Sequence, residues 1–322
     1  MTVQVASIGL SQIGVSAALV LGGQSKEIQF KGWDPDLDAR VAADRFKLFN
    51  PVCKKAQDAV RGANLVVLSL PSDEFLPTLK VLDVAMSRDV ALVNMSPMHA
   101  QTYTFVEEVF GKKIPFISIF PTLNPNSLQE YLYGARAARS DLFDKYLVFI
   151  ADAQDAPPAV LDLAADIAVL LGGQPVFTTP KELDGLIVAN LLLPQLCAAA
   201  LMNTAARQPS WQEGGKIAGG LLFHGTLPIS ELYEYKSLGF TARANRENMV
   251  RLAEDLMREL IQIRDSLKDD DPQKLSDLFN RALDSREDWL LERQRSETTS
   301  RMATSIPEKE EALKRFLKLA IR

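Results

Sequence analysis

Short β-rich segments alternate with amphipathic segments along the first 120 residues of the chain. The β-rich segments are residues 3–8, 29–33, 65–70, 91–94 and 115–119. Several of them are continuously apolar, as strands buried on both faces of a sheet are, and the stretches between them have helical spacing. The alternation predicts a parallel sheet covered by helices, the doubly wound α/β class.

The pattern changes after about residue 155. Residues 146–151 and 175–178 predict two late strands, whereas helical spacing dominates from about residue 157 onwards. We therefore predict a nucleotide-binding-type sheet domain over residues 1–155, with a boundary that could extend to about residue 179. An all-helical substrate and dimerisation domain would follow over residues 180–322.

The helical half contains one segment, Pro180–Arg207, that is nearly all apolar around its circumference. Such a helix fits a central position where neighbouring helices or a second subunit bury it, and we expect a homodimer formed through this half. Its longest apolar run is interrupted and shorter than a membrane span requires. Residues 241–267 and 272–295 predict two long amphipathic helices.

Composition excludes several classes of function. The 36 Lys and Arg against 41 Asp and Glu give a formal charge of −5, which argues against sequence-independent binding of nucleic acid. Cys53 and Cys197 lie far apart without metal-ligand spacing, so we expect no metal site and a reducing, cytoplasmic location. No Lys or Arg precedes the early apolar stretch, so export is not expected.

A glycine motif follows the first predicted strand. Gly9 and Gly14 bracket Ser11, Gln12 and Ile13, and a small-residue helix comes next. A strand, a glycine turn and a helix amino terminus together present backbone N–H groups to a pyrophosphate, so these five residues are candidate cofactor-binding positions. Ser11 replaces the middle glycine of the usual G-x-G-x-x-G pattern. A sheet domain that has lost its nucleotide therefore remains an alternative.

Asp34 ends the second predicted strand, 20 residues after Gly14. An acid at this point would accept the adenosine ribose hydroxyls and repel a 2′-phosphate. We therefore expect NAD as the cofactor, with NADP less favoured.

Polar residues follow the next two predicted strands. Ser69 and Pro71 end one of them, and Asn94 and Ser96 end the other. Ligands of open α/β sheets bind at the carboxyl ends of the strands, so we expect these residues beside the nicotinamide and the reacting carbon. Turn formation alone is the alternative reading.

Two histidines limit the choice of a proton acceptor near neutral pH. His99 would lie in the first turn of a helix that points at the cofactor cleft, and His224 lies in a small-residue segment of the helical half. Either side chain could instead be solvated without a catalytic role. We predict His99, Ser96, Asn190 and His224 as the candidate catalytic set.

Three segments resemble the prephenate dehydrogenases, within the 6-phosphogluconate-dehydrogenase-like superfamily. IGLSQIGVSAALVL is similar to the opening fingerprint of that family, ANLVVLSLPSDEFLPTLKVL to its third strand and helix, and TARANRENMVRLAEDLMREL to a late helix of its dimerisation domain. The resemblance implies a Rossmann domain followed by an all-α dimerisation domain, NAD-linked hydride transfer, and a dimer with intertwined helical domains.

The sequence departs from that family at its chemistry. Phe120-Pro121 stands where the family has a catalytic His-Pro, and Ser96-Pro97-Met98-His99 where it has Gly-Ser-Val-Lys. Asn190 matches an asparagine of the related hydroxyacid dehydrogenases, but Ile187 takes the place of their lysine. Neither catalytic set is complete.

Two hypotheses follow. The first is an NAD-dependent oxidoreductase whose small substrate differs from prephenate, and the second is an NAD(H)-binding sensor or structural dimer without turnover. For the first, we expect a cleft with Ser69, Pro71, Asn94 and Ser96 as its floor. Asn190 and His224 would form its roof.

Overall fold

A mixed sheet of eight strands organises the structure, a computed structural model that describes residues 2–111, 114–128, 134–152, 156–229, 237–294 and 306–321. The strand order is β3-β2-β1-β4-β5-β6-β7-β8. The strands are β1 (Val3–Ile8), β2 (Ile28–Trp33), β3 (Phe49–Val52), β4 (Leu65–Leu68), β5 (Ala91–Asn94), β6 (Phe116–Pro121), β7 (Leu147–Ala151) and β8 (Gln174–Thr178).

The predicted parallel α/β sheet is confirmed, with two differences. β6 and β7 run antiparallel, and the described residues of the connection between them form only two short 3-10 turns, with no crossover helix among them. β3, which pairs with β2, was not predicted because its segment is short and half polar.

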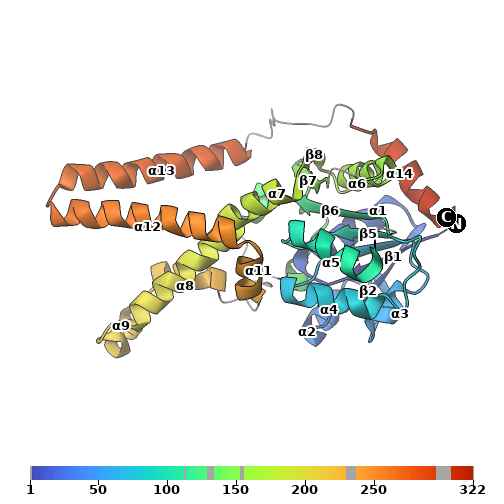
Figure 1. The fold of residues 1–322 in the computed structure, drawn as a ribbon, viewed down its shortest axis with the longest axis horizontal. Helices are drawn as coiled ribbons and strands as arrows, with labels where there is room; N and C mark the ends of the chain where they lie inside the picture. Colours follow the sequence, from blue (N-terminus) through green and yellow to red (C-terminus); the bar gives the residue numbers. More distant parts are fainter. Residues whose placement is uncertain are drawn as a thin grey trace.

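Helices cover both faces of the sheet (Figure 1). One face carries α1 (Gln12–Gln24), α2 (Leu37–Asp44), α6 (Pro158–Leu170) and α14 (Lys309–Leu317), and the other carries α3 (Ala56–Val60), α4 (Ser72–Leu82) and α5 (Ala100–Phe110). Side chains of β1 alternate between the two cores, with Val3 and Val5 in one and Ala6 and Ile8 in the other. Because successive side chains of a strand point to opposite faces, the apolar residues of β1 contribute to both cores.

Helix α14 returns from the helical half to pack on α6. Ala312 and Phe316 are completely buried in the same core as α1 and β1. Arg315 forms a bidentate ion pair with Asp166 of α6. A segment that the sequence groups with the helical half therefore completes one face of the sheet.

The remaining elements form the helical part. They are α7 (Pro180–Ile187), the π-helical turn η4 (Val188–Leu192), α8 (Leu193–Ala206), α9 (Trp211–Ile217), α10 (Gly220–Thr226), α11 (Leu238–Ala244), α12 (Arg246–Lys268) and α13 (Pro272–Gln294), with short 3-10 turns at Pro125–Ser127, Gly134–Ala137, Leu227–Ile229 and Lys318–Ile321. Figure 1 shows α12 and α13 as a hairpin that extends away from the sheet. The segment predicted as one helix over residues 241–267 is divided at Asn245.

Helix Pro180–Ala206 is long and apolar enough to cross a membrane by length and composition, with a mean hydropathy of 1.9. Core helices of soluble proteins pass the same test. Only 28% of its most apolar window is buried within the chain. The described helices of the single chain therefore leave most of this window exposed, where the sequence predicts burial by neighbouring helices or by a second subunit.

The packing of α14 gives a prediction. Phe316→Ala should lower the free energy of unfolding by about 3–5 kcal/mol, because it opens a cavity in the core between α6 and α14. Urea unfolding measures this change. Leu37→Ala, at a position 62% exposed, should change stability by less than about 0.5 kcal/mol. A similarly small effect of Phe316→Ala would contradict the packing.

Candidate cofactor and active site

The turn between β1 and α1 is built on two close backbone approaches. Gly9 has a φ of +92°, and a Cβ atom there would lie 2.1 Å from the backbone oxygen of Ser69. A Cβ atom at Gly14 would lie 2.7 Å from the backbone oxygen of Gly9. Neither position accepts a larger residue without a backbone shift. The glycines thus bring the start of α1 against the end of β4.

Ser11 turns its side chain into this loop. Its hydroxyl accepts a hydrogen bond from the backbone N–H of Gly14, which caps α1, and bonds the hydroxyl of Ser69. Both serine side chains are buried. The backbone N–H groups of Gln12 and Ile13 belong to the first turn of α1, where no intrahelical acceptor exists. The loop therefore keeps the anion-binding geometry of a helix amino terminus although its middle glycine is a serine.

Asp34 lies directly after β2 and is completely buried. Its Oδ2 accepts a hydrogen bond from the N–H of Leu10 at 2.6 Å, and its Oδ1 accepts one from the N–H of Asp36 at 2.8 Å. The carboxylate thus fastens the glycine loop to the end of β2. It also places a negative charge at this end of the sheet, as expected for a domain that disfavours a 2′-phosphate.

The predicted floor residues are brought together at the carboxyl ends of β4 and β5. The hydroxyl of Ser96 accepts from the N–H of Leu70 at 2.9 Å, and Asn94 Oδ1 accepts from the N–H of Ser96 at 2.9 Å. Asn94 and Ser96 are buried, whereas Pro71 is half-buried at the start of α4. Asn94 and Ser96 therefore form hydrogen bonds with each other and with the neighbouring backbone, and these bonds fix the conformation at the ends of β4 and β5.

His99 is completely buried at the N-cap of α5. Its Nδ1 lies 2.6 Å from the hydroxyl of Ser118, its ring meets that of Phe120 edge-on at 5.9 Å, and its Nε2 has no hydrogen-bond partner among the described residues. Burial lowers the pKa of His99 to about 3. The sequence predicts a proton acceptor that points at the cleft, but the side chain is enclosed and neutral at pH 7.

Ser118 links His99 to Asn94. Asn94 Nδ2 donates both to the carbonyl of Met98 and to the hydroxyl of Ser118. The same hydroxyl bonds Nδ1 of His99, and the ring nitrogen that carries the proton decides which of the two atoms donates.

Asp184 of α7 lies next to His99. Its two carboxylate oxygens accept the backbone N–H groups of His99 at 2.8 Å and Ala100 at 2.9 Å. A carboxylate from the helical part thus caps α5 and interacts favourably with its dipole. Burial outweighs these hydrogen bonds and raises the pKa of Asp184 to about 6.

Asn190 and His224 do not join the floor in the single chain. Asn190 is exposed, and its Nδ2 donates to the carbonyl of Leu186 within the same helix at 2.7 Å. His224 is exposed beside Phe223. Asn190 lies within the π-helical turn, which adds a residue to the helical repeat and rotates the faces that a 3.6-residue period predicts.

Sequence reasoning missed Ser118 and Asp184 at this end of the sheet, and Gln195 of α8 in the helical part, all of them buried. The Oε1 atom of Gln195 has no partner among the described residues. A signal existed for Asp184 and Gln195, because each is a polar residue within the largely apolar segment Pro180–Arg207, where a buried polar group needs a partner.

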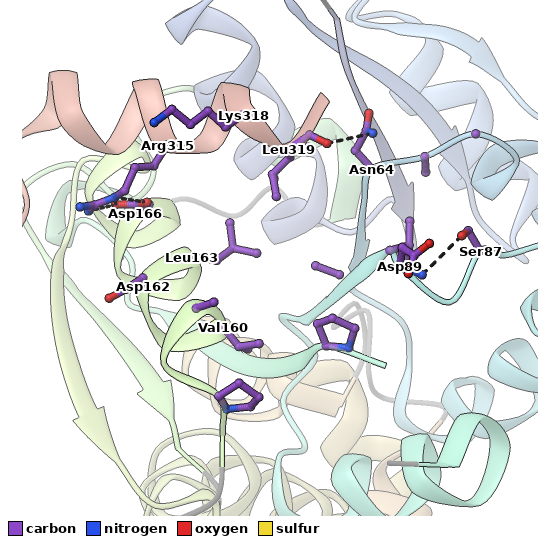
Figure 2. Close-up of a pocket in the computed structure, with 17 residues that line it drawn as sticks. Asn64, Ser87, Asp89, Val160, Asp162, Leu163, Asp166, Arg315, Lys318 and Leu319 are labelled. Carbon is purple, nitrogen blue, oxygen red and sulfur yellow. Dashed lines mark hydrogen bonds and ion pairs between the residues drawn. The ribbon is translucent and has the colours of Figure 1, made fainter. Parts of the chain in front are cut away.

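A cavity of about 650 Å³ lies at the amino ends of the strands, opposite the end that carries the glycine loop (Figure 2). Residues at the amino ends of β4 and β5 line it together with α6 and α14, including Asn64, Asp166 and Arg315. It is therefore separate from the glycine loop. Among the described residues, no group of three His, Cys, Asp or Glu side chains could hold a metal ion.

Comparison with known proteins gives a family match. The sequence profile of the family described as prephenate dehydrogenase, nucleotide-binding domain, matches residues 17–177, half of the chain. Curated protein sequences gave no match.

Solved structures agree in fold. Prephenate dehydrogenase from Aquifex aeolicus, in complex with hydroxyphenyl propionate and NAD+, aligns with a TM-score of 0.73 at 18% identity, over 89% of this chain and 98% of that one. Arogenate dehydrogenase from Synechocystis aligns with a TM-score of 0.65 at 17% identity, over 89% and 99%. At such identities the likeness establishes the fold.

The raised pKa of Asp184 predicts a pH effect on stability. An acid whose folded pKa lies above its unfolded value of 3.8 favours folding only while protonated, so its ionisation lowers stability as the pH rises from about 4 to above 6. Relative to Asp184→Asn, the unmutated protein should lose about 1–3 kcal/mol of unfolding free energy over this range. Urea unfolding of both proteins at pH 4.5 and 7.5 measures the loss. A difference that does not change with pH would contradict the shift.

Proposed function

Because the chain belongs to the prephenate dehydrogenase family, we propose that it is an NAD-dependent oxidoreductase that transfers hydride between nicotinamide and a small substrate. The β1–α1 turn carries this proposal. Its two glycines permit the close approach to β4, and the first turn of α1 offers the N–H groups of Gln12 and Ile13 to a pyrophosphate. NAD, which the Aquifex relative binds, would supply the hydride-accepting ring at the ends of β4 and β5.

The residues beside this position support a substrate that differs from prephenate. Phe120 replaces the proton-accepting histidine of the family, and it packs with Leu183 and Ile187 of α7 in an apolar cluster. A wall of this kind favours an apolar or uncharged group of the substrate. The predicted catalytic set of Ser96, His99, Asn190 and His224 stays a prediction, with Ser96 and His99 close to the proposed ring site.

Binding of NAD(H) without turnover is the second candidate. The observation that favours it is the apolar side chain of Phe120 together with the lowered pKa of His99, which makes this buried imidazole a weak base. Both candidates predict NADH binding, and only the first predicts oxidation or reduction of a substrate.

We further propose a homodimer of a cytoplasmic protein, with the helical part from about residue 180 as the interface. Large apolar side chains are exposed along this part in the single chain, among them Leu186, Leu201, Ile217, Leu221 and Phe223. Contiguous apolar surface of this kind marks an interaction site.

The charge of Asp34 predicts cofactor preference. Titration of NADH fluorescence should give at least about tenfold tighter binding of NADH than of NADPH, because a 2′-phosphate would approach a buried carboxylate. Asp34→Asn should reduce the preference, whereas Asp36→Asn, at an exposed acid two residues later, should keep it. Equal or tighter binding of NADPH by the unmutated protein would rule the proposal out.

The exposed apolar face predicts the oligomeric state. Multi-angle light scattering at micromolar concentration should give about twice the chain mass of 35.6 kDa. Leu221→Glu, at a side chain 95% exposed in the single chain, should shift the mass toward the monomer. A monomeric unmutated protein would exclude the dimer.

A further inference from the structure

A buried path of hydrogen bonds begins at the glycine loop. Ser11 bonds the hydroxyl of Ser69, and the next residue, Leu70, donates its N–H to the hydroxyl of Ser96. The N–H of Ser96 in turn donates to Asn94. The path thus crosses from the start of α1 over the ends of β4 and β5.

The path continues to the helical part. Asn94 donates to the hydroxyl of Ser118 on β6 at 2.7 Å, and Ser118 bonds Nδ1 of His99. The backbone N–H of His99 then donates to Asp184. Because Asn94 Oδ1 accepts from the N–H of Ser96, its Nδ2 is the atom that donates to Ser118.

Burial makes this path stiff. Its side chains from Asn94 to Asp184 are at most 5% exposed. Hydrogen bonds are stronger in such surroundings, and a link that is displaced leaves a buried polar group without a partner. A displacement at one end of the path therefore costs less free energy when the other end moves with it than when a hydrogen bond between them is broken.

Asp184 is the point where the path leaves the sheet. Its helix, α7, continues through η4 into α8, the long arm of the helical part. Its carboxylate holds two adjacent N–H groups of α5, so the position of α7 along α5 is fixed at this contact.

We propose that Asp184 is a positioning residue that couples the cofactor end of the sheet to the long helix α7–η4–α8. NADH bound at the glycine loop would order the path from Ser11 onwards and, through Asp184, reduce the motion of the helix. This inference rests on the proposed function, because the ligand that it couples is NAD(H).

Amide hydrogen exchange of the full-length protein, with and without saturating NADH, tests the coupling. In the unmutated protein, NADH should slow exchange over residues 180–192 by at least about fivefold. Asp184→Ala should abolish this slowing while the Kd for NADH changes by less than about threefold. Asp184→Asn, which keeps one acceptor oxygen, should retain part of it.

Thr179→Ala is the matched control. Thr179 caps α7 through a local capping box with Glu182 and makes no hydrogen bond to α5 among the contacts of the described residues. This variant loses a cap of the same helix, so it should keep the NADH-dependent slowing. A loss of slowing in Thr179→Ala as large as in Asp184→Ala would overturn the positioning role in favour of general helix stability.

The remaining outcomes separate the two proposals. Equal slowing in Asp184→Ala and the unmutated protein, or NADH binding without any slowing over residues 180–192, would overturn the coupling and leave the proposed function intact. No binding of NADH by the unmutated protein would overturn the proposed function and the coupling with it. If Asp184→Ala does not fold, Asp184→Asn decides, and full slowing in that variant overturns the inference.

Discussion

The close approach of Gly9 to the backbone of Ser69 is the constraint on which the candidate site depends. This contact leaves no space for a Cβ atom, so it fixes the course of the turn between β1 and α1 and the packing of that turn against the end of β4. The close approach also brings together the groups that bond in this loop. The hydroxyl of Ser11 bonds that of Ser69 and caps α1, and the Asp34 carboxylate accepts the N–H of Leu10. The shape of the loop is therefore set by its backbone, which explains why it tolerates a serine in the middle of its glycine motif.

The polar groups buried at the ends of β4, β5 and β6 form hydrogen bonds with one another and are shielded from solvent. Asn94, Ser96 and Ser118 satisfy one another, and His99 is neutral because its surroundings exclude water. These hydrogen bonds fix the positions of the polar groups at this end of the sheet, but few of the groups are ionisable. This balance is consistent with a family member whose cofactor end is retained and whose chemistry has diverged.

Local signals made the first part of the fold predictable. The strand at residues 3–8, the turn at its end and the strand ends at Ser69 and Asn94 are read from adjacent residues, and these elements are confirmed. The burial of His99 could not be read in this way, because its ring lies against Ser118 and Phe120 of β6 and its backbone bonds Asp184, 85 residues later in the chain. The orientation of Asn190 in the single chain could not be read from the sequence either. A π-helical turn changes the phase of the helix, and no side-chain period in the sequence marks that change.

The return of α14 to the sheet has a consequence for the order of folding. During synthesis, strands β1 to β8 leave the ribosome well before residues 309–317, yet Phe316 belongs to the same core as β1 and α1. The part of this face that α14 covers must remain exposed while more than a hundred residues of the helical part are made. Until then a nascent chain exposes apolar surface that a chaperone can recognise, although its glycine loop is already complete.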